Sequence, residues 1–408
     1  MYTDIFVRIC KIYTDVFPEN SFQFYFDWKK QHKIWKSKNI VTVKFHNTEK
    51  VFARIFKEWS IWLGESYCEW NIEVEDGVYK DFLFILVRVS YNSKKILWKL
   101  PLLDIFRVFK VQFSNKYFSR WSQEENINSH YSLSDWFDDE NNSNKFYLEW
   151  LNSWYIQYSC GKWDKWIDTL EKAQLNKLDF YAKRLWIDSR SKWKTLLDLG
   201  CGWWWMMFYM AEKYSIKCVW YTLSVAQAKY INGEIKKRKL DDLVSVELKN
   251  IHNIKWKYDY IVSVGVMEHI RDYNDLYKKI SFSLKKNWIT LIHSMFQNQR
   301  QQFAADPFLT KYIFPGWAIP QIKKNLRIFR KYFKHVDKND LPDKSYPKTI
   351  NCWYENFCKN EDKIRKLLIE NWKIKNPDYA IRVFKHYLAS VYCWLYEYEL
   401  VSNILAHN

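Results

Sequence analysis

The fold class follows from one junction, Leu196-Leu197-Asp198-Leu199-Gly200-Cys201-Gly202-Trp203-Trp204-Trp205. Its apolar start predicts a buried strand over 195–199, which runs into a tight glycine turn and then a helix over 206–214. Such a strand–glycine–helix junction cradles a nucleotide, because glycines let the backbone approach the ligand and the free amides of the helix start attract negative groups. Three tryptophans follow the glycines, where a loop of this kind needs small residues.

Downstream of this junction, predicted strands and helices alternate along the chain. The alternation predicts an α/β fold with a parallel, doubly wound sheet and right-handed crossovers. Ligand sites in such sheets lie at the carboxyl ends of the strands, which is where the polar motifs of this chain fall. The predicted strands are 195–199, 217–221, 244–248, 258–264 and 289–293, and the helices between them are 206–214, 225–238 and 274–284.

The region before the sheet has a different pattern. Residues 1–105 predict a small α+β domain of their own, with a boundary near Pro101. Residues 106–408 then form the second domain, whose ligand-binding core spans about 190–295. A basic, aromatic segment over 102–126 suits a membrane interface or an acidic partner, and equally a helix packed between domains.

Composition limits the classes of partner and compartment. The 408 residues carry a net charge of +18, which favours an anionic partner such as nucleic acid or anionic lipid, although some basic chains have no such partner. The eight cysteines form no CxxC pair, so we expect free thiols and no metal site. Because no run of about 18 apolar residues and no signal peptide is present, we expect a cytosolic protein.

Glycine and tryptophan occur in unusual numbers. The chain has 8 glycines and 24 tryptophans, whereas average usage predicts about 29 glycines. We hypothesise that many of these tryptophans are glycines whose UGA codons were read under the wrong genetic code. Several of them stand in predicted turns where a residue with positive φ is expected, namely Trp193, Trp256, Trp288 and Trp317. We expect UGG codons at Trp150, Trp163 and Trp353, which we take as true tryptophans. The hypothesis fails if UGG also encodes the turn residues.

An ordered set of motifs resembles the cyclopropane-fatty-acyl-phospholipid synthase family. The resemblance implies a Rossmann-like class I S-adenosylmethionine-dependent methyltransferase fold, with a mostly parallel seven-stranded sheet and a small N-terminal, lipid-associated domain. In that family Trp203 is a true tryptophan, whereas Trp70, Trp204, Trp205 and Trp220 stand at positions of glycine or another small residue. The motifs are His130-Tyr131, Tyr158-Ser159-Cys160, residues 197–203, Thr222-Leu223-Ser224 with Gln227, Glu268-His269, Leu291-Ile292-His293, residues 312–316, Tyr346 and Trp353.

The resemblance assigns residues to the cofactor, S-adenosylmethionine. It places the methionine part against Asp198, Gly200 and Gly202, and it makes Tyr158 and Ser159 a clamp for the cofactor carboxylate. The remaining cofactor residues are Thr222, Leu223 and Gln227 at the end of the second strand, with Asn250 and Ile251 beside the adenine.

The resemblance also implies a base for the reaction, a bound bicarbonate ion. Cys160, Glu268, His293 and Tyr346 match the groups that hold this ion. For Glu268 the alternative is a surface carboxylate at a helix start, and for His293 a core histidine. Cys393 is a weaker candidate, because the family's cysteine on the terminal helix corresponds here to Val391.

Together these features predict an enzyme that transfers a methylene group from S-adenosylmethionine to the cis double bond of unsaturated phospholipid chains, forming cyclopropane fatty acids. We expect it to work at a phospholipid membrane surface, as a cytoplasmic protein bound peripherally to the inner membrane, without a nucleic-acid partner; a homodimer stays open. The first alternative is a methyltransferase of the same superfamily that makes methyl-branched lipids or methylates a small molecule. The second alternative, which applies if Trp204, Trp205 and Trp220 are genuine, is a non-catalytic protein that binds a lipid surface. An RNA methyltransferase fits the charge, but no RNA-binding module is visible.

Overall fold

The computed structural model describes most of the chain as two compact units. One unit comprises residues 1–136, 306–315 and 373–397, and the other comprises 137–305, 316–372 and 398–408. The residues outside the description are 1, 19–20, 28–29, 35–37, 39, 58, 75–78, 92–97, 106–142, 152–154, 200–204, 223–224, 250–253, 255, 298–305, 315–316, 373, 398–400 and 408.

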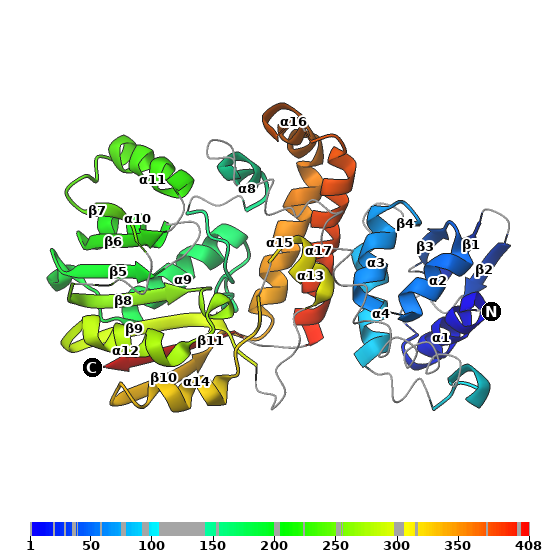
Figure 1. Ribbon diagram of the computed structural model, residues 1–408, viewed down its shortest axis with the longest axis horizontal. Helices are drawn as coiled ribbons and strands as arrows, with labels where there is room; N and C mark the ends of the chain where they lie inside the picture. The colour runs from blue at the N-terminus through cyan, green and yellow to red at the C-terminus, as the bar shows by residue number, and fades with distance from the viewer. Residues whose placement is uncertain are drawn as a thin grey trace. The chain divides into compact units, whose positions relative to one another are not determined.

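The larger unit, here called the sheet unit, contains a seven-stranded sheet of order β10-β11-β9-β8-β5-β6-β7 (Figure 1). Five consecutive strands of this order, from β9 to β7, run parallel to one another, and β11 is antiparallel to both of its neighbours, β9 and β10. The mostly parallel seven-stranded sheet is therefore confirmed. The strands are β5 (Thr195–Leu199), β6 (Lys217–Thr222), β7 (Val244–Leu248), β8 (Tyr258–Val264), β9 (Leu284–Met295), β10 (His335–Asp340) and β11 (Val401–His407).

Helices α10, α11 and α12 pack against strands of this sheet. Each predicted helix of the alternating core is present, and α10 follows directly on the undescribed glycine loop. The helices are α8 (Ser143–Leu151), α9 (Leu170–Arg184), α10 (Trp205–Tyr214), α11 (Val225–Arg238), α12 (Tyr273–Ser283), α14 (Ile322–Phe329), α15 (Ser345–Lys359) and α16 (Glu361–Trp372), with short 3-10 turns η1 (Ser189–Ser191) and η3 (Met267–His269).

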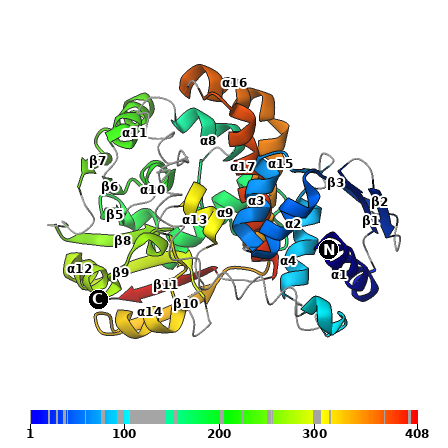
Figure 2. The same cartoon turned by 45° about the vertical axis from the view of Figure 1, so that its right-hand side comes forward.

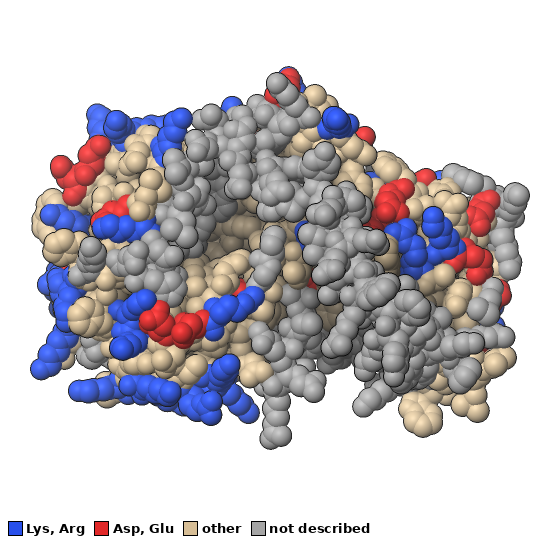
Figure 3. All heavy atoms as spheres, viewed as in Figure 1, with Lys and Arg blue, Asp and Glu red and all other residues tan. Residues whose placement is uncertain are grey.

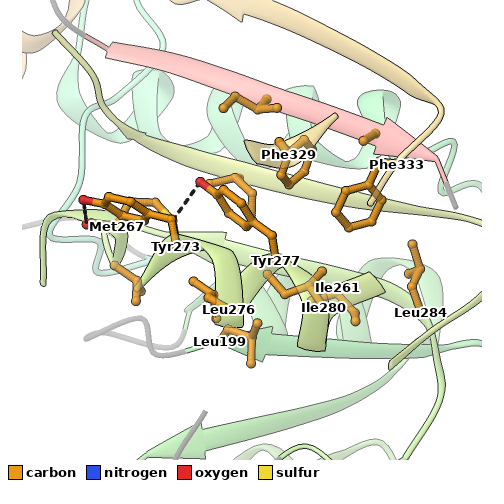
Figure 4. Packing of buried hydrophobic residues seen from close by; sticks show 14 of the residues in the cluster. Leu199, Ile261, Met267, Tyr273, Leu276, Tyr277, Ile280, Leu284, Phe329 and Phe333 are labelled. Atoms are coloured by element: carbon orange, nitrogen blue, oxygen red, sulfur yellow. Dashed lines mark hydrogen bonds between the residues drawn. The ribbon is translucent and has the colours of Figure 1, made fainter. Parts of the chain in front are cut away.

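One buried cluster joins the sheet to α12 and α14 (Figure 4). Apolar side chains of α12 recur at helical spacing at Leu276, Tyr277 and Ile280, so a single face of the helix packs against the strands. Within the cluster, the Tyr277 hydroxyl donates a hydrogen bond of 2.7 Å to Oδ1 of Asn325 on α14. This bond lets a polar tyrosine tip remain buried and fixes α14 against α12.

The smaller unit is α+β, as predicted for the N-terminal region. Its sheet has the order β2-β1-β3-β4, and α17 contacts both α3 and α4 (Figure 2). Helices α13 and α17, which come late in the sequence, also belong to this unit. The predicted boundary near 105 adjoins the undescribed residues 106–142 and stays a prediction. The elements are α1 (Tyr2–Val16), β1 (Ser21–Phe26), β2 (Lys30–Ile34), β3 (Ile40–Phe45), α2 (Thr48–Lys57), α3 (Trp59–Cys68), β4 (Ile72–Val74), α4 (Tyr79–Tyr91), α13 (Pro307–Tyr312) and α17 (Pro377–Glu397).

Three tryptophans have the left-handed backbone conformation that favours glycine. Their φ angles are 62° at Trp70, 55° at Trp186 and 67° at Trp193, and all three side chains are exposed. The turn expected at Trp193 is thus confirmed, and Trp186 is an addition that the sequence did not point to. The expectation for Trp288 is wrong, because the left-handed residue there is Asn287 and Trp288 lies in β9. Trp256 and Trp317 each follow an undescribed residue.

None of the helices that the structure describes is both long and apolar enough to cross a bilayer.

Candidate functional site

Asp198 occupies the carboxyl end of β5, at the predicted nucleotide junction. The side chain is 1% exposed, and its Oδ1 atom has no hydrogen-bond partner among the described residues. Burial disfavours the charged carboxylate and raises the pKa of Asp198 to about 8. A buried carboxyl with an unsatisfied oxygen is suited to a ligand that brings a hydrogen-bond donor or a positive charge.

Several of the predicted cofactor residues cannot be placed. Gly200, Gly202, Leu223, Asn250 and Ile251 lie outside the described residues. The backbones of Thr222, at the end of β6, and Gln227, in the first turn of α11, are described without their side chains. Both positions adjoin the carboxyl edge of the sheet, where the fold class binds its ligands.

The predicted clamp, Tyr158 and Ser159, lies beside α9 and α15. The Tyr158 ring packs at centroid distances of 5.4 Å from Trp150 and 5.3 Å from Trp353, both of which are buried. Ser159 is held by two side chains of α9. Gln174 donates a 3.0 Å hydrogen bond to its carbonyl oxygen, and the Lys177 ammonium donates one of 2.6 Å to its hydroxyl.

Lys177 is a functional candidate that the sequence did not single out. Its side chain is fully buried, an unusual environment for a lysine. An ammonium group only donates hydrogen bonds, so the Ser159 oxygen must accept from it and the hydroxyl proton points elsewhere. Lys177 therefore makes Ser159 a donor toward any acceptor in the site. The sequence did contain a signal for this burial. Lys177 lies at helical spacing from Ala173, Leu178 and Tyr181, which form the buried face of α9.

The segment that contains Cys160 is hydrogen-bonded to α15, the helix that carries Tyr346. Cys160 is buried, and the next backbone amide, that of Gly161, donates a 3.0 Å hydrogen bond to the Thr349 hydroxyl. Thr349 lies one helical turn after Tyr346 on α15. Tyr346 itself is half-buried.

Glu268 lies in η3, just after β8 and Gly265. It is 3% exposed, so the alternative of a surface carboxylate is excluded. Its Oε1 atom accepts a 2.9 Å hydrogen bond from the backbone amide of Met295 on β9. Burial raises the pKa of Glu268, and the Met295 amide opposes this by stabilising the charged form. The group therefore holds its proton more readily than an ordinary glutamate.

His293 lies on the same strand as Met295, two residues earlier and on the same face. It is 3% exposed, and its ring lies 5.6 Å from that of Tyr181 in an edge-on arrangement. Tyr181 follows Lys177 by one turn on α9, so a single face of this helix touches both Ser159 and His293. The structure therefore brings the predicted clamp and the predicted catalytic histidine to the same side of α9.

Cys393 lies in the smaller unit, on α17. It is buried, and its Sγ atom lies 3.5 Å from the carbonyl oxygen of Lys80.

Comparisons with known proteins identify the family of the chain. Residues 118–395 match the family described as mycolic acid cyclopropane synthetase. The chain is 27% identical to the cyclopropane-fatty-acyl-phospholipid synthase of Escherichia coli over 83% of this chain and 80% of that protein. It is also 27% identical to a probable fatty acid methyltransferase of Pseudomonas putida, over 65% of this chain and 64% of that protein.

Two solved structures have the same fold. The cyclopropane synthase MmaA2 of Mycobacterium tuberculosis matches with a TM-score of 0.57 at 22% identity, covering 68% of this chain and 98% of that one. Coclaurine N-methyltransferase, solved with N-methylheliamine and SAH, matches with a TM-score of 0.55 at 22% identity, covering 81% and 100%. These structures have the class I S-adenosylmethionine-dependent methyltransferase fold. With most of its length matched, the chain belongs to the mycolic acid cyclopropane synthetase family and is an S-adenosylmethionine-dependent methyltransferase.

Proposed function

We propose that this enzyme transfers the methyl carbon of S-adenosylmethionine to the cis double bond of unsaturated phospholipid chains and closes a cyclopropane ring. The proposal rests chiefly on the buried polar groups around α9, where Ser159 and His293 contact one face of the helix. The similarity to the Escherichia coli phospholipid synthase supports a phospholipid substrate. A cytoplasmic enzyme bound peripherally to the membrane fits this substrate, and a homodimer stays a prediction.

The described residues fit the cofactor's amino-acid portion. Asp198 has a buried oxygen without a described partner, which suits the ammonium group of the methionine part. Ser159, set as a donor by Lys177, suits the carboxylate. In this proposal Gly200 and Gly202 complete the loop, Thr222, Leu223 and Gln227 border the ribose, and Asn250 and Ile251 flank the adenine. When bound, S-adenosylmethionine supplies an electrophilic methyl group.

Ring closure requires a base, because a proton must leave the added methyl carbon. We assign this role to bicarbonate, held by Glu268, His293, Tyr346 and the backbone at Cys160. Glu268 suits an anionic partner because its raised pKa favours the protonated carboxyl, which donates a hydrogen bond. His293 and Tyr346 would donate further hydrogen bonds to the bicarbonate. Because Glu268 is itself held by the Met295 amide, its carboxyl has a fixed direction.

A methyl-branched product is the second candidate. It would arise at the same double bond if a proton were lost from a neighbouring carbon of the acyl chain. The similarity to a probable fatty acid methyltransferase favours this alternative, and so does the valine at position 391. Methylation of a small molecule is the third candidate. The chain is 28% identical to an (S)-coclaurine N-methyltransferase, but over 55% of its length, whereas the match to the phospholipid synthase covers 83%.

The test combines methyl-labelled S-adenosylmethionine with vesicles of unsaturated phospholipid and the protein as its own codons specify it. We expect label in the lipid fraction, with a ring in the product by mass spectrometry and NMR. Saturated phospholipid serves as the substrate control. Cofactor binding without lipid labelling would contradict the proposal, and a labelled branched chain would select the second candidate.

A further inference from the structure

Helix α14 and the turn after it form a strongly basic surface. Between Asp306 and Asp337 the chain has no acidic residue. Six exposed cations lie on this segment, and in Figure 3 blue side chains follow the edge of the sheet unit where Figure 1 places α14. We call these six the α14 basic face: Lys323, Lys324, Arg327, Arg330, Lys331 and Lys334.

The opposite face of α14 is fixed in the core. Ile322 and Phe329 are buried in the cluster that joins the helix to the sheet, and Phe333 joins them from the following turn. Asn325 is also buried and bonded to Tyr277. The α14 basic face is therefore carried on a helix and turn whose apolar side is packed in the core, where Figure 4 labels Phe329 and Phe333.

The described residues do not neutralise the charges of this face. None of its six cations has an ion-pair partner among the described residues. Several exposed cations elsewhere in the sheet unit do have one, as in the pairs Lys172–Asp168 at 2.8 Å, Lys213–Asp179 at 2.6 Å and Lys237–Glu234 at 3.3 Å. A cluster of unpaired cations attracts an extended anionic partner more than a solvated, paired surface does.

We propose that the α14 basic face docks the enzyme on the surface of a bilayer containing anionic phospholipid. This inference rests on the proposed function, because a phospholipid substrate obliges an enzyme to meet the bilayer. A basic surface can hold such an enzyme on the bilayer by electrostatic attraction. Clusters of Lys and Arg bind anionic lipid headgroups through the negative potential of the leaflet, which falls off within a Debye length. Nucleic acid is the other polyanion that the face could attract, and the experiment includes it.

The experiment measures vesicle binding by co-sedimentation, with the full-length protein as its gene encodes it. Phosphatidylglycerol–phosphatidylcholine vesicles are compared with pure phosphatidylcholine. The test variant is Lys324→Glu with Arg327→Glu, and the matched control is Lys363→Glu with Lys366→Glu, another exposed pair three residues apart on α16. We expect the test variant to bind anionic vesicles at least tenfold more weakly, the control to bind within twofold of the unaltered protein, and 0.5 M salt to remove the difference.

Folding and function are followed separately. Affinity for S-adenosylhomocysteine should be equal in all variants, which shows an intact cofactor site. Should the double reversal fail to fold, the neutral pair Lys324→Gln with Arg327→Gln is expected to weaken vesicle binding by a smaller factor. Equal binding by test and control variants would overturn the inference, as would equal binding to neutral and anionic vesicles. A loss of RNA or DNA binding with vesicle binding unchanged would also overturn it. Vesicle binding without methyl transfer would leave docking supported and defeat the proposed reaction instead.

Discussion

Two buried aspartates on neighbouring parallel strands differ in how the protein satisfies them. Asp259, at the amino end of β8, accepts hydrogen bonds from the Thr195 amide at 2.8 Å, the Thr195 hydroxyl at 2.7 Å and the Lys285 ammonium at 2.9 Å, and these partners lower its pKa. Asp198, at the carboxyl end of β5, is equally buried, yet its Oδ1 has no described partner and its pKa is raised to about 8.

The difference separates two uses of the same residue type. At the amino edge of the sheet the carboxylate binds two strands to each other and is a structural group. At the carboxyl edge Asp198, like Glu268, is held in a state that favours its proton, which is unfavourable for folding unless a ligand compensates. This contrast supports the prediction, made from the fold class, that the ligand binds at the carboxyl edge.

The largest expected effect is on catalysis, through Glu268→Gln. General acid–base contributions amount to about 10²–10⁴-fold in rate, so we expect lipid methylation to fall by at least about 10²-fold. Affinity for S-adenosylhomocysteine should remain within twofold. The matched control is Asp275→Asn, a half-exposed carboxylate on α12 that pairs with Lys279 and should leave the rate unchanged. Equal rates in both variants would remove Glu268 from the site.

The next effect is on stability, through Asp259→Asn. Hydrogen bonds to a charged group contribute about 1.5–3 kcal/mol each, and the change removes the charge that Lys285 and Thr195 bind. We expect the free energy of unfolding in urea at pH 7 to fall by ~2–3 kcal/mol. If the loss is no greater than for Asp198→Asn, the contrast between the two edges is wrong.

The pH dependence of Asp198→Asn tests the other side of the comparison. Because the folded pKa lies near 8, above the unfolded value of about 3.9, the folded state keeps a proton that the unfolded chain has released. Ionisation of Asp198 therefore lowers stability as the pH rises from about 4 to 8. The variant should be ~1–3 kcal/mol more stable than the unaltered, cofactor-free protein at pH 8 and similar at pH 4. For Asp259, whose pKa is lowered, stability should instead be lost as the pH falls below about 4.

A smaller effect concerns the buried cation Lys177. We expect Lys177→Met to weaken S-adenosylhomocysteine binding by about tenfold. Without Lys177, Ser159 is no longer fixed as a donor, and its charge-assisted hydrogen bond to the ligand carboxylate is lost. Binding of 5′-methylthioadenosine, which lacks the amino-acid portion, should be unchanged in calorimetry. Lys172→Met on the exposed side of α9 is the control. Equal losses for the two ligands would show that Lys177 supports the fold and not the carboxylate clamp.

The smallest effect concerns the backbone at the amino edge. Trp193 is exposed and left-handed just before β5, and a non-glycine residue there costs roughly 1–2 kcal/mol. Trp193→Gly should therefore raise the free energy of unfolding by ~0.5–1 kcal/mol. Trp163→Gly should lower it by ~3–5 kcal/mol, because that indole is buried and donates a 3.0 Å hydrogen bond to Thr349. If Trp193→Gly does not raise the free energy of unfolding, the result would count against the hypothesis that UGA codons encode glycine here.

Local patterns in the sequence predicted the parallel core, because each strand and helix there has its own apolar period and the glycine junction marks its carboxyl edge. Glu268 and His293 were named from the resemblance to the synthase family, and the structure shows that both are buried. The outer strands β10 and β11 were missed, since β11 pairs with β9 across more than a hundred residues and nothing local signals that pairing. Lys177 was missed because a lysine on a helix is ordinarily exposed. Trp186 and Asn287 were missed because a left-handed residue depends on how the turn closes.

The most direct test of the central claim, methyl transfer to a lipid double bond, is the reaction of labelled S-adenosylmethionine with unsaturated phospholipid vesicles, run alongside Glu268→Gln. The account predicts a labelled phospholipid whose acyl chain is one methylene heavier and contains a ring, with the variant at least about 10²-fold slower. A protein that binds S-adenosylhomocysteine but leaves the lipid unlabelled would contradict it.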